Sequence, residues 1–181
     1  MPPSRALFIG RFQPFHNGHL IMAKRIRERH DELIIGIGSA QYSHTGENPF
    51  TAGERYEMIH RALDAAGVED YNIVPIPDTH VHSVWVSHIL SLLPTFESVY
   101  TNSALVIRLF KERKINVVSL RMEDRENLSG TEIRRRMLKA EAWRTLVPTV
   151  VAEYIDEIDG VRRIQETHRY STPYGTKENA D

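Results

Sequence analysis

Short apolar runs alternate with longer stretches of mixed polar and apolar residues along most of the chain. Each run is nearly continuous in hydrophobic side chains, which is typical of strands that are buried on both faces of a parallel sheet. The runs that we expect to form strands are residues 6–10, 33–38, 71–77, 98–101 and 115–118.

The stretches between these runs have the periodicity of amphipathic helices. Within residues 18–30, Leu20, Ile21, Ala23 and Ile26 cluster on one helical stripe, and most of the charged side chains fall outside it. Further helices are expected over residues 51–67, 83–93, 104–113, 129–139 and 148–159.

Capping residues indicate where some of these helices begin and end. Thr51 and Glu54 form one capping box, and Ser129 and Glu132 form a second. Gly67 is well placed to end the helix that Thr51 begins. These signals are independent of the apolar periodicity, and they support the same segmentation.

The alternation of strands and helices predicts the fold class. Strands separated by helical crossovers run parallel. Right-handed crossovers that place helices on both faces of the sheet give a doubly wound sheet. We therefore predict an α/β protein with a doubly wound, parallel five-stranded sheet of the Rossmann-like kind. Residues 1–166 are expected to form a single domain. Residues 167–181 have few apolar anchors and many turn formers, which predicts a flexible C-terminal tail.

The composition narrows the classes of function. The 181 residues include 23 Lys or Arg and 24 Asp or Glu, so the net charge of −1 offers no broad surface for nucleic acid. The chain has no cysteine, which excludes disulfides and all thiolate chemistry. No apolar run is long enough to span a bilayer and no cleavable signal pattern is present, so we expect a soluble, cytoplasmic protein without a membrane partner.

The loop after the first predicted strand carries the strongest chemical signal. It reads GRFQPFHNGH from Gly10 to His19, and it places a guanidinium and two imidazoles around the amino end of the first helix. Ligands of doubly wound sheets bind at the carboxyl ends of the strands, and a helix amino end favours anions. Gly10 allows the backbone to approach a phosphate, and Gly18 allows close packing at the helix start. The spacing of His16 and His19 lets both rings donate to phosphate oxygens.

Two other interpretations of this loop stay open on the residues alone. His16 and His19 can be surface histidines at a helix start, with Arg11 in solvent. Paired histidines are also common zinc ligands. Zinc needs a third protein ligand, however, and the chain has no cysteine and no H-E-x-x-H helix. We therefore expect no protein-bound metal.

The same loop resembles the H-x-G-H signature of the nucleotidylyltransferase superfamily, which class I aminoacyl-tRNA synthetases share in looser form. Residues 37–41 (IGSAQ) and 48–55 (NPFTAGER) are similar to archaeal-type nicotinamide-mononucleotide adenylyltransferases. The likeness extends from about residue 5 to residue 164, which implies the nucleotidylyltransferase variant of the Rossmann-like fold.

The resemblance implies a role for each residue of the loop. Arg11 and His19 would act on the transferring phosphorus, and His16 would orient it. The residues that would bind the ATP phosphates are Gly10, Phe12 and Gly18.

Residues 129–136 (SGTEIRRR) resemble the second phosphate motif of the superfamily. In that motif a Ser/Thr helix start and an Arg three residues after the Thr hold the triphosphate. The resemblance thus implies phosphate contacts by Ser129, Gly130, Thr131 and Arg134. A capped helix start beside an arginine suits an anion in any family. The residues alone also allow an ordinary capped helix whose arginine run is a solvated face.

The resemblance places a mononucleotide pocket at Gly38, Ser39, Asp78 and Trp85. The Trp85 indole would stack on the nicotinamide ring and attract its positive charge. On the residues alone, a core tryptophan packed with Ile89 and its neighbours is the favoured interpretation.

Two positions depart from the family pattern. Members tend to carry Asn where His82 stands, and Gly-Asn-Pro where residues 102–104 read Asn-Ser-Ala. These departures put in doubt the amide contacts to the nicotinamide and part of the adenosine contact. They leave the phosphate motifs intact, so a different preference among mononucleotides is compatible with the sequence.

The resemblance implies an enzyme that transfers the adenylyl group of ATP to nicotinamide mononucleotide and forms NAD and pyrophosphate. Mg²⁺ would be carried by the ATP phosphates, and the chain would form a closed homo-oligomer such as a hexamer. Two alternatives stay open. One is another phosphate acceptor, namely nicotinic acid mononucleotide, flavin mononucleotide or pantetheine phosphate, and the other is a nucleotide-binding module without turnover. A dehydrogenase is disfavoured because G-x-G-x-x-G is missing after the first strand.

Overall fold

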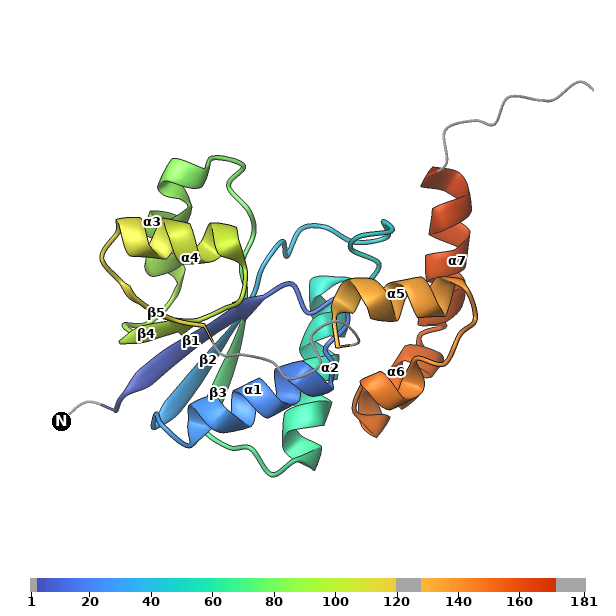
Figure 1. Cartoon of the computed structure of the whole chain (residues 1–181), viewed down its shortest axis with the longest axis horizontal. Coiled ribbons are helices and arrows are strands. Elements are labelled where there is room, and N and C mark those ends of the chain that lie inside the picture. The colour runs from blue at the N-terminus through green and yellow to red at the C-terminus, as the bar shows by residue number, and fades with distance from the viewer. Residues whose placement is uncertain (1–2, 120–127, 172–181) are drawn as a thin grey trace, which may run out of the picture.

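The computed structural model of the chain describes residues 3–119 and 128–171 (Figure 1). In this part of the chain five strands and seven α-helices are joined by loops and one short 3₁₀ helix, η1. In chain order the elements are β1 (Arg5–Gly10), α1 (Asn17–Arg27), β2 (Glu32–Ile37), α2 (Ala52–Ala65), β3 (Tyr71–Pro75), α3 (His82–Leu92), β4 (Ser98–Tyr100), α4 (Ala104–Glu112), β5 (Asn116–Val118), α5 (Gly130–Leu138), η1 (Arg144–Leu146), α6 (Thr149–Glu157) and α7 (Gly160–Ser171).

The strands form one parallel sheet in the order β3-β2-β1-β4-β5. In the centre, Phe8 of β1 pairs with Ile35 of β2 on one side and with Tyr100 of β4 on the other. The chain winds outward from β1 to β3 and then returns past β1 to β4. The predicted doubly wound, Rossmann-like α/β fold is confirmed, and the winding direction reverses between β1 and β4, where such sheets bind their ligands.

Successive residues of each strand face opposite sides of the sheet, and they build two cores. Ala6 and Phe8 of β1 belong to a core that includes apolar side chains of α1, α2, α5, α6 and α7. Leu7 and Ile9 belong to a second core, with α3 and α4. Figure 1 shows α3 and α4 on one face of the sheet and α1 and α2 on the other. Burial on both faces explains why the strands are continuous apolar runs.

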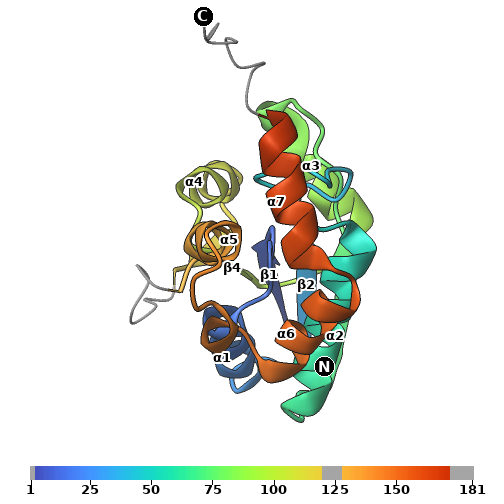
Figure 2. The ribbon, with the colours of Figure 1, turned by 90° about the vertical axis from the view of Figure 1, so that its right-hand side faces the viewer.

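The three C-terminal helices cover the end of the sheet at which the strands finish. Figure 2 views the molecule from this end and shows α5, α6 and α7 in front of the strands. Ile133 and Met137 of α5 and Ile155 of α6 are fully buried in the core that contains Phe8. This packing holds the amino end of α5 close to the loop that follows β1.

Two predictions of detail differ from the structure. On α1 the core-facing stripe consists of Met22, Ala23 and Ile26, whereas Ile21 is 48% exposed. The C-terminal segment is helical as far as Ser171, so α7 passes the predicted domain end at residue 166, because its buried Ile164 anchors it to the core. The rest of the predicted tail, residues 172–181, lies outside the described residues.

The capping prediction for α2 is confirmed. The Glu54 backbone N–H donates to Thr51 Oγ1 at 3.1 Å, and the Thr51 N–H donates to the Glu54 carboxylate at 2.8 Å. Gly67 has a φ of 65° just beyond the helix, in the left-handed region that favours glycine at helix ends.

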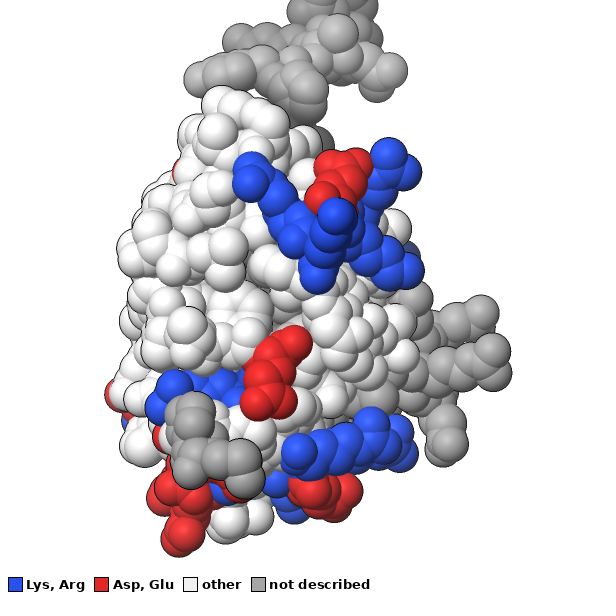
Figure 3. Space-filling view, turned by 90° about the vertical axis from the view of Figure 1, so that its left-hand side faces the viewer, with Lys and Arg blue, Asp and Glu red and all other residues white. Residues whose placement is uncertain are grey.

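Charged side chains on the amino-terminal side of the strands gather in small groups. Figure 3 shows this face, where groups of basic and acidic residues are separated by uncharged surface. Within the described ranges, no helix combines the length and the apolar character that crossing a membrane requires.

Candidate active site

A cavity of about 660 Å³ opens at the carboxyl ends of the strands. This volume is in the usual range of about 300–1,000 Å³ for small-molecule sites. The predicted site residues that line it are Gly10, Arg11, His16, His19, Gly38, Ser39, Asp78, Trp85, Ser129 and Gly130. The other lining residues are Phe8, Ile9, Met22, His80, His82, Thr101, Asn102, Ser103, Leu105, Val106, Leu109 and Leu128.

Four of the predicted site residues lie behind or beside this lining. Phe12 is buried with a φ of 52°, and its ring lies 3.2 Å from the place that a Cβ on Gly10 would occupy. Gly18 is buried in the first turn of α1, and Thr131 is exposed near the start of α5. Phe12 and Gly18 thus support the loop, and the remaining residue, Arg134, contacts it directly.

His16 and His19 cap the start of α1 reciprocally. The His19 backbone N–H donates to His16 Nδ1 at 3.4 Å, and the His16 N–H donates to His19 Nδ1 at 3.2 Å. The two rings stack with their centroids 3.5 Å apart. Because each Nδ1 accepts a hydrogen bond, each neutral ring carries its proton on Nε2. The pair therefore offers two Nε2–H donors at the wall of the cavity.

Burial keeps both imidazoles neutral. The His19 ring lies 4.8 Å from the Phe12 ring and 5.4 Å from the Phe15 ring, centroid to centroid. Removal from water lowers the pKa of His16 to about 4. The pKa of His19 lies well below its ordinary value, first because of burial and then because of its neighbour His16. At pH 7 both rings donate hydrogen bonds without carrying a charge.

The positive charge of the site comes from two arginines on distant segments. Arg134 of α5 donates from Nη1 to the Gln13 carbonyl, in the loop after β1, at 2.8 Å. Burial and the positive charge of Arg11 lower the pKa of Arg134 to about 10, so it stays protonated at neutral pH. Its hydrogen bonds go to neutral carbonyl oxygens, and its charge remains to attract an anion. The two predicted phosphate motifs therefore meet.

A glycine makes this meeting of α5 and the loop possible. A Cβ on Gly130 would lie 2.9 Å from the Gln13 carbonyl oxygen and 3.3 Å from Arg134 Nη1. No real side chain tolerates the first distance, so the close approach requires glycine. Beside it, Ser129 Oγ accepts from the Glu132 N–H at 3.2 Å and caps the helix, while its hydroxyl proton can still donate to a ligand.

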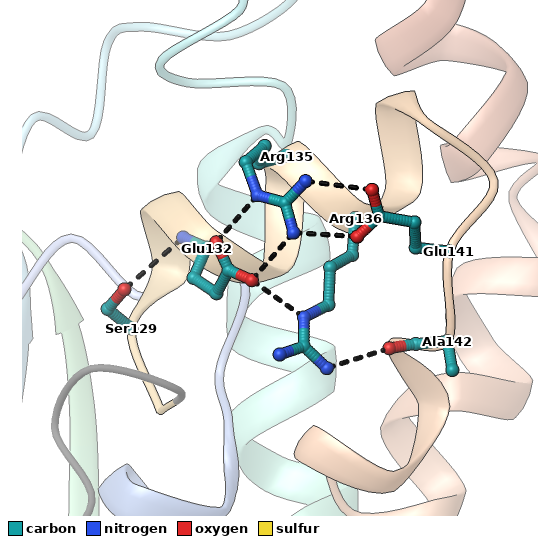
Figure 4. Close-up of polar contacts among 6 residues, drawn as sticks. All are labelled: Ser129, Glu132, Arg135, Arg136, Glu141 and Ala142. Carbon is teal, nitrogen blue, oxygen red and sulfur yellow. Dashed lines mark hydrogen bonds and ion pairs between the residues drawn. The ribbon is translucent and has the colours of Figure 1, made fainter.

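The other two arginines of α5 belong to a network on the far side of the helix (Figure 4). Glu132 accepts hydrogen bonds from Arg135 and Arg136 at 2.7–2.8 Å, and Arg135 also pairs with Glu141. The side chain of Glu132 therefore does not return to the Ser129 N–H, and only half of the predicted second capping box forms. Of the arginine run, Arg134 alone contacts the loop after β1 within the described residues.

The opposite end of the cavity is held by polar contacts between the loops after β2 and β3. Ser39 Oγ donates to Asp78 Oδ2 at 2.7 Å. The side-chain amide of Gln41 donates to the Asp78 carbonyl at 3.0 Å and accepts from the Asp78 N–H at 2.9 Å. These contacts leave Asp78 Oδ1 as an acceptor that a hydroxyl or amide of a ligand can use.

Trp85 packs in the second core and also lines the cavity. It is 8% exposed and packs edge-on against Phe110, with ring centroids 5.9 Å apart, yet it also lines the cavity. Residues at both departures from the family pattern also line the cavity: His82 in the first turn of α3, and Asn102 and Ser103 after β4. Both positions can therefore influence which ligand fits.

The sequence reasoning missed a buried arginine that joins the loops of the site. Arg55 of α2 is fully buried, and it donates to the carbonyls of Gly38 at 2.8 Å, Arg11 at 2.9 Å and Ser39 at 3.2 Å. Burial lowers its pKa to about 10. A signal was present, because Arg55 falls on the same helical stripe as the core residue Met58.

The described residues contain no group of three or more His, Asp or Glu side chains that could hold a metal ion. The Nδ1 atoms of His16 and His19 already accept backbone hydrogen bonds, so the Nε2 atoms carry the ring protons and present donors where a metal ion needs a lone pair. The donor set of this cavity therefore fits the oxygens of a polyphosphate better than a zinc ion.

Comparisons with known proteins agree with this geometry. Residues 7–136 match the Cytidylyltransferase-like family. The chain is 54% identical over 162 residues to a nicotinamide-nucleotide adenylyltransferase of Picrophilus torridus, a match that covers 90% of this chain and 96% of that protein. It is 52% identical over 170 residues to one of Methanolobus tindarius, with 94% and 98% covered. The chain belongs to the nicotinamide-nucleotide adenylyltransferase family.

A solved structure of low sequence identity shows the same fold. A bifunctional NMN adenylyltransferase/ADP ribose pyrophosphatase from Francisella tularensis, complexed with AMP and a manganese ion, superposes with a TM-score of 0.72 at 21% identity. The match covers 93% of this chain and 53% of that protein, so this chain spans about half its length. Membership of the family, predicted from the H-x-G-H loop together with residues 37–41 and 48–55, is confirmed by the sequence matches over nearly the whole chain.

Proposed function

We propose that the protein transfers the adenylyl group of ATP to nicotinamide mononucleotide, forming NAD and pyrophosphate. The observation that carries this proposal is the convergence of two distant segments on one cavity. Arg11, His16 and His19 follow β1, and the start of α5 brings Ser129 and Gly130 to the same wall. Relatives that are 54% and 52% identical bear the name of this activity.

The chemistry of the reaction matches the kind of groups that the site provides. A 5′-phosphate oxygen of the acceptor forms a bond to the α-phosphorus of ATP, and the bond from that phosphorus to the β-phosphate oxygen breaks. The attacking phosphate is already anionic and needs no general base. Catalysis then consists of positioning the reactants and stabilising the charge that develops on the phosphoryl groups.

Each polar group has a proposed place along the polyphosphate. The Nε2–H of His19 and the guanidinium of Arg11 would bind the α-phosphoryl oxygens, and the Nε2–H of His16 would orient the same group. Arg134 and the backbone N–H groups at the start of α5 would bind the β- and γ-phosphates. Neutral imidazoles suit this role, since hydrogen bonds from a neutral donor to a charged phosphate are strengthened by the phosphate charge.

Mg²⁺ would enter the site as part of the MgATP substrate. The ion prefers oxygen ligands and keeps several waters. The phosphates and these waters can therefore supply most of its ligands, with few from the protein. Use of a divalent ion is also consistent with the manganese in the Francisella tularensis structure.

The acceptor would lie at the end of the cavity formed by Asp78, His82 and Trp85. The π-face of the Trp85 indole would stack on the pyridinium ring and attract its positive charge. Asp78 Oδ1 can accept from a carboxamide or a ribose hydroxyl. We place nicotinamide mononucleotide first because these acceptors suit its amide and its cationic ring, while nicotinic acid mononucleotide carries an additional negative charge.

Product analysis tests the function directly. Purified protein is incubated with MgATP and, separately, nicotinamide mononucleotide, nicotinic acid mononucleotide, flavin mononucleotide or pantetheine phosphate. Pyrophosphate release is measured, and the product is weighed by mass spectrometry. The proposal predicts the mass of NAD and stoichiometric pyrophosphate with the first acceptor. If a product forms only with another acceptor, that acceptor is the substrate in place of nicotinamide mononucleotide. If ATP binds but no pyrophosphate is released with any acceptor, the protein is a non-catalytic module.

A further inference from the structure

The loop between β2 and α2 reaches from the sheet toward α5 (Figure 1). Its residues form hydrogen bonds with both Arg11 and Arg134. Its base is fixed, because the Gln13 side-chain amide donates to the Phe50 carbonyl at 2.8 Å and accepts from the Phe50 N–H at 3.0 Å. Its tip is a small closed turn in which the Thr45 N–H donates to the Asn48 carbonyl at 3.2 Å and the Asn48 N–H donates to Thr45 Oγ1 at 3.0 Å. The tip is therefore held together by its own hydrogen bonds.

The turn places one backbone and one side-chain acceptor on the two arginines. Glu47 Oε2 accepts from Arg11 Nη1 at 3.4 Å. The neighbouring Gly46 carbonyl accepts from Arg134 Nε at 3.1 Å. The carboxylate thus lies where two guanidiniums from distant segments come together, and it acts as their counter-ion.

These contacts are weak enough to be exchanged. The Arg11 and Glu47 side chains are 48% and 81% exposed, and the distance between them is long for an ion pair. At the base of the turn, the buried Asn48 Oδ1 has no hydrogen-bond partner among the residues that the structure describes. The turn is thus held on the arginines by few interactions, whereas an ATP polyphosphate offers several charged oxygens to the same two side chains.

We propose that Glu47 is an internal competitor of the ATP polyphosphate. In the free protein its carboxylate occupies Arg11, and ATP binding displaces it as the phosphates take over the arginine. The residue thereby sets the affinity for ATP without taking part in the chemistry. This inference rests on the proposed function in one respect only, namely that a nucleoside triphosphate is the ligand at Arg11 and Arg134.

The test measures MgATP binding by calorimetry in the absence of any acceptor. Glu47→Gln removes the competing charge and keeps the size of the side chain. Because exposed ion pairs of this kind contribute about 0.2–1 kcal/mol, the variant should bind MgATP about 1.4- to five-fold more tightly. Glu157→Gln is the matched control. Glu157, the last residue of α6, is exposed, forms an ion pair with Arg61 of α2, and lies outside the cavity lining. Its affinity should equal that of the unaltered protein.

A double-mutant cycle separates competition from simple repulsion at a distance. In an Arg11→Gln variant, Glu47 and ATP no longer compete for the same guanidinium. The gain in MgATP affinity from Glu47→Gln should then fall to nearly one-fold. An equal gain in both backgrounds, or no gain in either, overturns the proposal.

The outcomes also distinguish this inference from the proposed function. If NAD forms and MgATP binds but Glu47→Gln changes nothing, the inference fails and the function stands. If the affinity responds as predicted and no dinucleotide forms with any acceptor, the inference stands and the function fails. If the unaltered protein binds no MgATP, both are wrong.

Discussion

His16 and His19 show how the backbone decides what an imidazole can do. Each Nδ1 accepts a backbone N–H, so the tautomer is fixed and the Nε2–H is left to donate to a ligand of the cavity. The sequence predicted both residues from their spacing and their place at a helix start. It could not predict that they stack at 3.5 Å and are held neutral, because that depends on their burial in the folded loop, where the Phe12 and Phe15 rings pack against His19.

His19→Ala tests the proposed role of this ring in the reaction. Loss of one donor that acts mainly on the transition state should lower kcat about 10²-fold, or ~3 kcal/mol. Steady-state kinetics with MgATP and nicotinamide mononucleotide measure the effect, and His60→Ala on the exposed face of α2 is the control. Turnover of His19→Ala close to that of the control would refute the role.

The neutral state of His16 also predicts how stability depends on pH. Its pKa is about 4 in the folded chain against 6.5 when unfolded, so the unfolded state takes up the proton first as the pH falls. The contribution of neutral His16 to the free energy of unfolding is fully present above pH 6.5 and is lost as the pH falls from 6.5 to 4. It amounts to about 3 kcal/mol, given 1.36 kcal/mol for each tenfold change in proton affinity.

Urea unfolding across this pH range measures the effect. His16→Asn keeps an acceptor at the helix cap but does not titrate, so its free energy of unfolding should fall less than that of the unaltered protein. The difference between the two curves should grow by about 3 kcal/mol from pH 7 to pH 4. Parallel curves would show that His16 is not held neutral in the folded state.

At the scale of elements, helix α5 carries the part of the site that the sequence described least completely. Three consecutive arginines follow its capped start, and successive residues of a helix point about 100° apart. Only the packed structure shows which of them turns to the loop after β1: Arg134 does, while Arg135 and Arg136 join Glu132 on the other side (Figure 4). The sequence allowed a phosphate motif or a solvated face, and the helix turns one arginine to the loop after β1 and two to Glu132.

Gly130→Ala tests whether the close approach of α5 is required. The new Cβ would lie 2.9 Å from the Gln13 carbonyl oxygen, a backbone atom that can move only if the helix or the loop shifts. We expect at least a tenfold weaker affinity for MgATP, about 1.4 kcal/mol, because the two phosphate-binding segments are forced apart. Calorimetric titration with MgATP measures the change.

Gly53→Ala in the first turn of α2 is the matched control. A Cβ at Gly53 would have Thr51 Oγ1 as its nearest neighbour at 4.0 Å, so the substitution meets no obstruction. Its affinity for MgATP should not change, and the gain in helix propensity should leave the chain as stable or slightly more so. Equal behaviour of the two variants would mean that the contact at Gly130 does not position the site.

At the scale of the whole molecule, the order of strands and helices was predictable and the site was predictable in part. Continuous apolar runs gave the buried strands, and the crossovers gave a parallel sheet with its ligand crevice between β1 and β4. Contacts between segments far apart in the chain were not predictable. Arg55 and Glu47 act through loops whose paths no local pattern specifies. The oligomeric state and the cytoplasmic location stay predictions.

The central claim is that the loop after β1 and the start of α5 bind one polyphosphate together. A crystal structure of the protein with Mg²⁺ and a non-hydrolysable ATP analogue tests it most directly. We predict that a single triphosphate contacts His19 Nε2 and Arg11 at its α-phosphoryl end, and Arg134 and the Ser129–Gly130 backbone at its far end. A triphosphate bound by only one of these two segments, or bound outside the cavity, would contradict the account.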